Sequence, residues 1–320
     1  SSTGGASITD YIVQFSSNSG TSWSTFADGI STSTSVTVTG LTNGTPYNFK
    51  VSATNSSGNG SASSSSRSIT PAVACTSNCA VGDVGPGGGI IFITPATTGN
   101  STGKYFEAAP FDLESKTDWC GSTVYATISG AVGTDIGSGE SNTAAMVAYP
   151  CTSGAGYQAD AYVSPNGTAD WFLPSSLEFT QVCAQKTVTG LRSSATYKSS
   201  TNYTSPNYWG FVLNTLSCGG DNYFKGLTGY VRPVRSFTTP GALTGLSGTA
   251  GNAQVVLSWS APTTGGAVIT DYVVEYSSNS GTSWSMFTDG TSASTGATVT
   301  GLTNGTSYTF RVSATNAAGT

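Results

Sequence analysis

Four acidic residues close together in the sequence are the first candidates for chemistry: Glu107, Asp112, Glu114 and Asp118. A pair of carboxyl groups on either side of a sugar is what glycoside hydrolysis requires. The spacing alone does not bring two of them together, and we favour the interpretation that they are solvated acids on loops.

The chain contains no histidine. Nucleophile activation by a Ser-His-Asp or Cys-His arrangement is therefore impossible, and so is general-base catalysis by histidine. The usual nitrogen ligand of zinc is also missing, and Cys75-x3-Cys79 is not followed by a second close cysteine pair. We expect no enzymatic activity and no cofactor.

The six cysteines all lie between Cys75 and Cys218. An even number in one region is typical of a disulfide set in an exported protein. Pairing each cysteine with its neighbour in the sequence is one of several arrangements that six cysteines allow, and it predicts Cys75–Cys79, Cys120–Cys151 and Cys183–Cys218.

The composition indicates a mainly β protein with many turns. Only 8% of the residues are charged, 11% are aromatic, and there are 41 glycines. This is too aromatic for a disordered chain and too poor in Lys and Glu for a helical one. The formal charge of −5 argues against nucleic acid and anionic membrane surfaces as partners. No apolar run is long enough to span a membrane.

The strongest local folding signal is the stretch from Asp170 to Phe179. Trp171 belongs to a short buried strand, which Pro174 ends. Ser175 is expected to cap a new helix while Glu178 reaches back to the cap, as in a capping box. This helix is expected to bury one face, formed by Leu177, Val182 and Cys183. A second short helix, containing Met146, is expected to be capped by Ser141.

Two further patterns in the middle of the chain predict structure rather than binding. The glycines at 85–89 lack the Gly-Lys-Ser/Thr ending of a phosphate loop, so we read them as a turn into a buried strand that ends at Ile93. Arg232 and Arg235 are expected to hold the last strand to buried carbonyls or carboxylates rather than to bind anions.

The two ends of the chain are copies of one module. Residues 10–24 match residues 271–285, residues 40–45 match residues 301–306, and no gap is needed between them. In the first copy, alternation of polar and apolar residues predicts strands at 11–15, 35–39 and 47–51.

The repeated module resembles the fibronectin type III domain. Trp259 lies on its second strand, and the run Leu302, Gly305, Tyr308, Phe310 and Val312 follows. The corresponding run in the first copy is Leu41, Gly44, Tyr47, Phe49 and Val51. The resemblance implies a two-sheet sandwich in which Tyr47 and Tyr308 tie down the loop before their strand.

Both copies are incomplete, and in complementary ways. The first has no equivalent of Val255–Trp259, and the second has no equivalent of Ser61–Thr70. A sandwich that lacks edge strands exposes apolar core and unpaired backbone groups. We therefore expect that residues 1–320 do not form an isolated, well-folded monomer. Either they belong to a longer repetitive chain, which we favour, or neighbouring subunits complete the sandwiches.

The middle of the chain carries a second resemblance, through six motifs in order: Val81-Gly-Asp83 with Gly85-Pro-Gly-Gly-Gly89, Glu107-Ala-Ala-Pro110, Asn142-Thr-Ala-Ala145, Asp170-Trp-Phe-Leu-Pro-Ser175, Tyr208-Trp209 and Val231-Arg-Pro-Val-Arg235. This region is similar to the bacterial Lcl C-terminal-like domain. The resemblance implies a C-type-lectin-like fold, an exported bacterial protein and a role in adhesion. It also supports the pair Cys120–Cys151.

A C-type-lectin-like shape invites a sugar site, with calcium as one alternative because its loops are rich in oxygen ligands. The Glu-Pro-Asn and Trp-Asn-Asp signatures of calcium lectins are missing, so a glycan or protein ligand without calcium is favoured. The candidate ligand residues are Asn202, Tyr203, Asn207, Tyr208, Asp221, Asn222 and Tyr223.

Together these patterns predict a mainly β chain in which fibronectin type III sandwiches flank a C-type-lectin-like α+β domain. The expected divisions are a partial module at 1–71, a disulfide-bonded domain at 72–239 and a second partial module at 240–320. We expect a structural or adhesive segment of an exported bacterial surface protein or extracellular filament that contacts flanking modules or itself head-to-tail. The alternative is a glycan-recognition module that targets a separate enzyme to polysaccharide.

Overall fold

The computed structural model describes residues 5–64, 69–113, 116–121, 127–149, 151–202, 209–214, 218–224 and 228–320, with only the backbone described at 209–214 and 219–224. The chain divides into two compact units, an N-terminal unit of Ser1–Val73 and a second unit of Ala74–Thr320. Within the second unit we call residues 74–238 the α+β domain and residues 239–320 the C-terminal module. The described part of the chain has no helix long and apolar enough to cross a membrane.

The N-terminal unit is built on one four-stranded sheet with the order β2-β1-β3-β4. Its strands are β1 (Ile8–Ser16), β2 (Ser24–Thr25), β3 (Asn48–Asn55) and β4 (Gly58–Asn59). The antiparallel pair β1–β3 places Val13 opposite Val51 and Phe15 opposite Phe49, so apolar side chains are matched across the pair. The strands predicted at 11–15 and 47–51 are thus present, the second of them beginning at Asn48.

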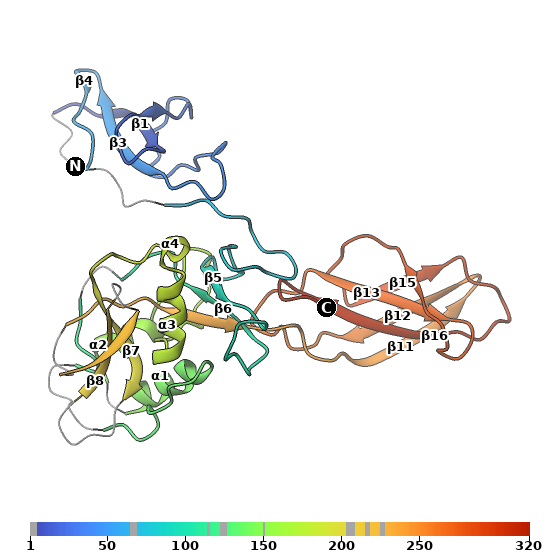
Figure 1. Ribbon diagram of the computed structural model, residues 1–320. Coiled ribbons are helices and arrows are strands. Elements are labelled where there is room, and N and C mark those ends of the chain that lie inside the picture. The colour runs from blue at the N-terminus through green and yellow to red at the C-terminus, as the bar shows by residue number, and fades with distance from the viewer. Residues whose placement is uncertain are drawn as a thin grey trace. The chain divides into compact units, whose positions relative to one another are not determined.

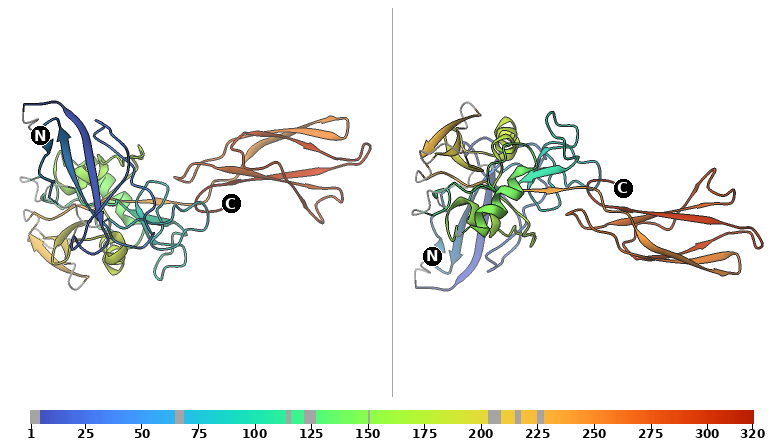
Figure 2. Two further views of the ribbon diagram at one scale, coloured as in Figure 1. Left: turned by 90° about the horizontal axis from the view of Figure 1, so that it is seen from above. Right: turned by 90° about the horizontal axis from the view of Figure 1, so that it is seen from below.

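The C-terminal module is a sandwich of two three-stranded sheets, ordered β11-β12-β15 and β14-β13-β16. Figures 1 and 2 show the two sheets as separate layers, coloured orange to red. Its strands are β11 (Thr244–Gly251), β12 (Gln254–Ser260), β13 (Asp271–Ser277), β14 (Ser285–Phe287), β15 (Gly296–Thr300) and β16 (Thr309–Thr315). Leu257, Trp259, Val274 and Val299 are buried between the layers, so alternate residues of the strands form the core.

The strand predicted at 35–39 is wrong. The equivalent residues of the C-terminal module form β15, which pairs with β12 from Gln254↔Thr300 to Ser258↔Gly296. The N-terminal unit has no strand at 35–39. A strand needs a partner for its backbone groups, and among the described strands of the N-terminal unit none pairs with these residues as β12 pairs with β15.

The two predicted tyrosine contacts are confirmed. The hydroxyl of Tyr47 accepts a hydrogen bond from the amide of Thr42 at 3.2 Å. In the C-terminal module the hydroxyl of Tyr308 accepts one from the amide of Thr303 at 3.1 Å. Each tyrosine therefore fixes the loop that precedes its own strand, at the same place in both copies.

The α+β domain combines two small antiparallel sheets with four helices. One sheet has the order β10-β6-β5 and the other β7-β8-β9. The strands are β5 (Ile90–Ile93), β6 (Tyr105–Ala108), β7 (Thr196–Asn202), β8 (Trp209–Asn214), β9 (Gly219–Phe224) and β10 (Val234–Phe237). The helices are α1 (Ser138–Ala148), α2 (Gly154–Asp160), α3 (Ser176–Ala184) and α4 (Lys186–Thr189). One core cluster joins the first sheet to α3 through Phe92, Phe106, Val182 and Val234. The predicted mainly β fold class is confirmed.

Helix α3 begins as the sequence predicts. The Ser175 side chain accepts from the Glu178 amide, and Glu178 accepts from the Ser175 amide at 2.7 Å, which completes the capping box. Val182 and Cys183 are buried, as expected. The prediction that Leu177 is buried is wrong, because its side chain is 46% exposed and Phe179 packs inward in its place.

The expected cap of the helix that contains Met146 is also wrong. Helix α1 begins at Ser138, after Gly137 in the left-handed conformation, so Ser141 lies within its first turn. The hydroxyl of Ser141 donates to the Ser138 carbonyl instead of capping an amide. A glycine tolerates this backbone conformation without steric cost, which is why the helix can start earlier.

Three disulfides join Cys75 to Cys79, Cys120 to Cys151 and Cys183 to Cys218, the same pairs that neighbour pairing predicts. The bond Cys120–Cys151 lies in the largest apolar cluster, next to Trp119, Met146 and Leu173. The three bonds therefore bind loops and helix ends into the core of the α+β domain.

Candidate functional site

Glu107 lies on β6 and is fully buried. Its Oε1 lies 2.6 Å from Nη1 of Arg235, on the neighbouring strand β10. Its two carboxylate oxygens accept hydrogen bonds from the amides of Gly87 and Gly89, each at 2.8 Å. The expectation that Glu107 is a solvated loop acid is therefore wrong, because it lies on a strand and its side chain is fully buried.

The glycines at 85–89 allow the backbone to come close to this carboxylate. A Cβ atom at Gly87 would lie 2.7 Å from Cδ of Arg235 and 2.9 Å from Oε1 of Glu107, closer than real Cβ atoms come. Only glycine lets the backbone amides reach the carboxylate. The run is thus a turn into β5, as predicted, and it also forms part of a buried polar cluster.

Arg235 links Glu107 to a second acid. Its Nε and Nη2 donate to the two oxygens of Asp170 at 2.6 and 2.8 Å, a bidentate pair. Burial works against the charged guanidinium, but the hydrogen bonds to Asp170 and the charge of Glu107 outweigh it and raise the pKa of Arg235. Its guanidinium is also 5.9 Å from the ring of Trp171. We call Glu107, Asp170 and Arg235 the Arg235 cluster.

A second buried cluster surrounds Asp112, which is 4% exposed. Its Oδ1 accepts from Nη2 and Nε of Arg232 at 2.6 and 2.8 Å, and its Oδ2 accepts from Nε of Arg192 at 2.9 Å and from the Tyr197 hydroxyl at 3.0 Å. Arg232 also donates to the carbonyl of Ala109 at 3.0 Å. The prediction that Arg232 and Arg235 hold the last strand to buried acceptors is confirmed, and Asp112 is not a loop acid in solvent.

The other two acids of the sequence cluster do not join these sites. Glu114 lies outside the described residues. Asp118 is half-buried, and its Oδ1 accepts from the amide of Gly121 at 2.7 Å. Burial lowers the pKa of the Lys198 ammonium to about 8, and the negative charge of Asp118 partly opposes this effect. Glu107 and Asp112 are thus each paired with an arginine.

Among the residues described, no group of three or more His, Cys, Asp and Glu side chains could hold a metal ion.

Of the seven predicted ligand residues, Asn202 is the one whose side chain is described. It ends β7, is 2% exposed, and its Nδ2 donates to the carbonyl of Ile128 at 3.4 Å. Tyr203, Asn207 and Tyr208 lie outside the described residues. Asp221, Asn222 and Tyr223 lie on strand β9, paired with β8, rather than on a loop. The strand registers place Asn202 and Tyr223 in one row of this sheet, on either side of Gly210 of β8.

The residues that the sequence did not single out lie where the α+β domain meets the C-terminal module. Arg235 reaches across and donates from Nη2 to the carbonyl of Gly266. The amide of Thr238 donates to the carbonyl of Gly265 at 2.7 Å. From the other end of the module, Nδ2 of Asn316 donates to the carbonyls of Thr238 and Thr264 at 2.8 and 2.7 Å.

An apolar cluster lies beside these hydrogen bonds and draws on both parts. From the α+β domain it contains Cys79, Ile91, Tyr105 and Phe237, and from the C-terminal module Ala267, Ala317 and Ala318. The rings of Tyr105 and Phe237 are stacked with centroids 5.3 Å apart. We call these hydrogen bonds and this cluster the junction. The apolar cluster is buried and the hydrogen bonds beside it are part-buried, and the Arg235 cluster supplies one of them.

The sandwich with its tyrosine contacts agrees with what a scan of protein families finds. The family model of the Fibronectin type III domain matches residues 1–69 and 239–320. The two terminal modules are thus similar to the fibronectin type III domain. Together they cover the two ends of the chain and leave the α+β domain between them.

Several solved structures are similar to this chain, either over part of its length or with a low structural overlap. "Titin kinase and its flanking domains" is 33% identical over 26% of this chain and 15% of its own, with a TM-score of 0.24. A crystal structure of domains from titin is 20% identical over 39% of this chain and 49% of its own, with a TM-score of 0.26. The chicken CNTN1 FN1-FN3 domains are 16% identical over 99% of this chain and 87% of their own, with a TM-score of 0.21. The alignments span less than two thirds of both titin chains. No curated protein matches the chain by sequence.

Proposed function

We propose that this chain is a structural and adhesive segment of an exported bacterial surface protein or extracellular filament. In this proposal an α+β domain of C-type-lectin-like fold is set between fibronectin type III modules, which meet flanking modules head-to-tail. The single observation that carries the proposal is the junction, because its hydrogen bonds and apolar contacts join the domain to the module.

The chemistry of the buried acids supports a structural role. Glu107 and Asp112 each form an ion pair with an arginine of the segment that leads into the C-terminal module. Removing charged groups from water is costly, and their pairing recovers that cost only with close geometry. Such clusters fix a unique packing more readily than they serve a reaction.

The resemblance to the Lcl C-terminal-like domain is supported by what its motifs do here. Glu107 and Asp170, from two different motifs, accept hydrogen bonds from Arg235 of the last motif. Gly87 and Gly89, from a third motif, donate their amides to Glu107. Motifs that are distant in sequence but contact one another around one side chain are what a shared fold would require. An adhesive role and a bacterial source follow from this resemblance and belong to the proposal.

An extracellular location is supported by the three disulfides, since such bonds persist in oxidising compartments. Immunogold labelling of cells that produce the native protein tests it. We expect label on the cell surface or along extracellular filaments, in stretches that contain repeated modules. Label confined to the cytoplasm would refute the proposal.

Glycan recognition is the second candidate, and one observation favours it. Asp221, Asn222 and Tyr223 are consecutive on β9, the outer strand of the described sheet β7-β8-β9. Polar residues together with an aromatic residue on an edge strand are a composition that suits a sugar ligand. Binding of the chain to a glycan array, lost in Tyr223→Ala and kept in Tyr157→Ala, would support it. Loss of binding in EDTA would add calcium.

A further inference from the structure

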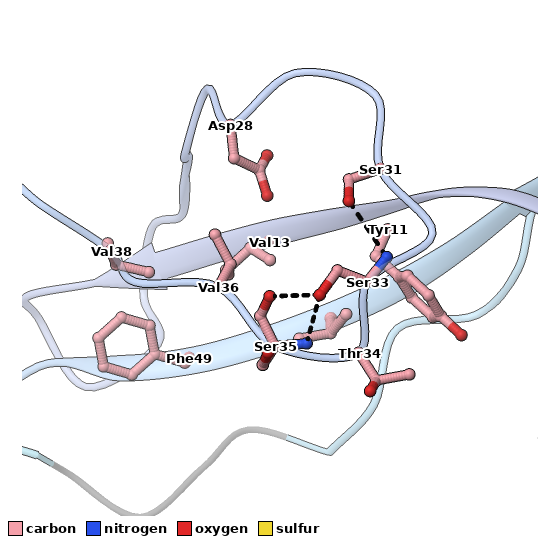
Figure 3. A pocket seen from close by; sticks show the side chains of 11 residues that line it. Tyr11, Val13, Asp28, Ser31, Ser33, Thr34, Ser35, Val36, Val38 and Phe49 are labelled. Atoms are coloured by element: carbon pink, nitrogen blue, oxygen red, sulfur yellow. Dashed lines mark hydrogen bonds between the residues drawn. The ribbon is translucent and has the colours of Figure 1, made fainter.

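Two hollows in the described chain differ in the groups that line them. The hollow over β1 and β3 is mainly apolar, as Figure 3 shows, and the charged residue in its lining, Asp28, is negative. A hollow of about 430 Å³ in the α+β domain is lined mainly by polar and positively charged residues, which include Lys116, Arg192, Ser193, Ser194, Thr196 and Tyr230. We call this second hollow the Tyr230 pocket, and its charge favours a negatively charged ligand.

Backbone pairing brings the residues of the Tyr230 pocket together from three segments. The amide of Thr117 donates to the carbonyl of Gly229 at 3.0 Å. The amide of Tyr230 donates to the carbonyl of Thr196, at the start of β7, at 2.9 Å. The segment of Gly229 and Tyr230 therefore lies between the segment that carries Lys116 and the strand that begins at Thr196.

Both cations of the pocket lie against the ring of Tyr230. Nζ of Lys116 is 4.9 Å from the ring centroid, and the guanidinium carbon of Arg192 is 4.5 Å from it. The ring attracts each cation, but two positive charges held near one ring also repel each other. An anion that contacts both side chains would relieve this repulsion.

The charges around the pocket are not balanced. Asp112 pairs with Arg192, and it also pairs with Arg232, whose side chain is fully buried. Lys116 forms no ion pair with a carboxylate of the described residues and contacts the Tyr230 ring instead. Three cations against one carboxylate leave an excess of two positive charges.

Several hydrogen-bond donors of the pocket are available to a ligand. Nε of Arg192 donates to Asp112 at 2.9 Å, whereas no acceptor among the described residues takes a hydrogen bond from its Nη1 or Nη2. The Arg192 side chain is 37% exposed, so these groups can reach a ligand. Ser193 and Ser194 form an exposed turn beside it. Phosphate oxygens are strong acceptors and suit such a set of donors.

We propose that the Tyr230 pocket binds the phosphate group of a sugar phosphate. The second pKa of a phosphate monoester is about 6, so the group carries about two negative charges at pH 8 and matches the excess of two positive charges. A sulfate ester or a carboxylate carries one. The hydroxyls of Ser193, Ser194 and Thr196 can donate to and accept from the sugar hydroxyls. This activity goes beyond the structural function, which rests on the junction and is untouched if the binding test fails.

A set of matched anions tests the proposal on the full chain 1–320. Glucose 6-phosphate, glucose 6-sulfate and glucuronate present different anions on the same kind of sugar, and inorganic phosphate presents the anion without a sugar. Each is titrated at pH 8 and low ionic strength, and the NMR shifts of backbone amides are followed. We expect saturable shifts at 192–196, with glucose 6-phosphate bound about tenfold more tightly than the sulfate ester or glucuronate. We also expect it to bind more tightly than inorganic phosphate, and the reverse order would overturn the assignment of a sugar ligand.

Variants of one exposed lysine locate the site. Lys116→Gln should weaken binding of glucose 6-phosphate about tenfold, and Lys116→Glu should abolish it. Lys50→Gln is the matched control, because it removes the same charge from a lysine that also lies over an aromatic ring, 4.3 Å from the centroid of Trp23 in the N-terminal unit. We expect this control to bind as the unaltered chain does.

Three results would overturn the proposal. Equal affinity for the three glucose-derived anions would show that the pocket does not recognise the charge of a phosphate monoester. Equal weakening by Lys116→Gln and Lys50→Gln would show that net charge alone attracts the ligand. Shifts that do not saturate, or that leave 192–196 unaffected, would show that the Tyr230 pocket is not the binding site.

Discussion

Nη1 of Arg235 lies 2.6 Å from Oε1 of Glu107, and both side chains are buried between strands β10 and β6. Arg235 also donates to Gly266, so one guanidinium ties a carboxylate of the α+β domain to the backbone of the C-terminal module. Glu107, one of the four acids considered for chemistry in the sequence, is therefore part of a structural connection.

Replacement of Glu107 by glutamine should strongly destabilise the α+β domain. The change leaves the buried Arg235 with one charged partner fewer, and breaking a buried pair costs about 3–5 kcal/mol. Denaturant unfolding of the full chain, followed by Trp fluorescence, measures the loss. The matched control is Glu275→Gln, which removes an exposed bidentate pair with Arg311 and should change stability little. Equal effects of the two changes would contradict the structural role of the Arg235 cluster.

Stability should fall as the pH rises through the titration of Glu178. Burial raises the pKa of this carboxyl from 4.5 to about 7, against the opposing amides of Ser175, Gly137 and Gly139. Below pH 4.5 the group is protonated in both states, whereas between 4.5 and about 7 only the unfolded chain loses the proton. The free energy of unfolding should therefore drop by about 3 kcal/mol across this window.

Glu178→Gln should remove this part of the pH dependence, because glutamine does not titrate. Glu140→Gln is the control, since that side chain is 64% exposed on α1. Unfolding curves at several pH values from 4 to 8 measure both variants. A slope that is unchanged in Glu178→Gln would show that another group causes it.

The disulfides should differ in what they contribute to stability. Cys183 and Cys218 close a loop of 35 residues, and Cys75 and Cys79 close a loop of 4. Loop entropy gives about 4 kcal/mol for the longer loop and about 2 kcal/mol for the shorter one. The double variants to serine, compared by thermal unfolding without reductant, should follow this order. A larger loss from the Cys75/Cys79 variant would mean that its contact with the junction outweighs loop entropy.

Each tyrosine contact should stabilise its own module by a similar amount. Tyr308→Phe removes the acceptor of the Thr303 amide, and Tyr47→Phe removes that of Thr42. A lost hydrogen bond of this kind costs about 1 kcal/mol. Hydrogen exchange should become faster at Thr303 in the first variant and at Thr42 in the second, with no crossover between modules. Unchanged exchange at both amides would contradict the assignment.

Local signals were the part of the fold that the sequence predicted well. The capping box of Ser175 and Glu178 and the loop contacts of Tyr47 and Tyr308 depend on residues a few positions apart. Their geometry is set by the local backbone, and so their spacing is informative. Helix α1 is the exception, because a glycine in the left-handed conformation starts it without a side-chain cap.

Long-range pairing was the part that the sequence could not supply. Arg235 and Glu107 come from strands far apart in the chain, and the sequence predicted a buried acceptor for the arginine but solvent for the acid. The position of Glu107 between Phe106 and Ala108 in an apolar strand was the available signal. The prediction for residues 35–39 failed for the opposite reason, since their local pattern suits a strand but none of the described strands pairs with them.

The most direct test of the structural account measures whether the α+β domain and the C-terminal module move as one body. Residual dipolar couplings of backbone amides, recorded on the full chain, report the orientation of each part. We expect couplings from 74–238 and 239–320 to fit one alignment tensor, and we expect Asn316→Ala combined with Ala317→Asp to split it in two. Two different tensors in the unaltered chain would contradict the claim that the junction fixes the module to the domain.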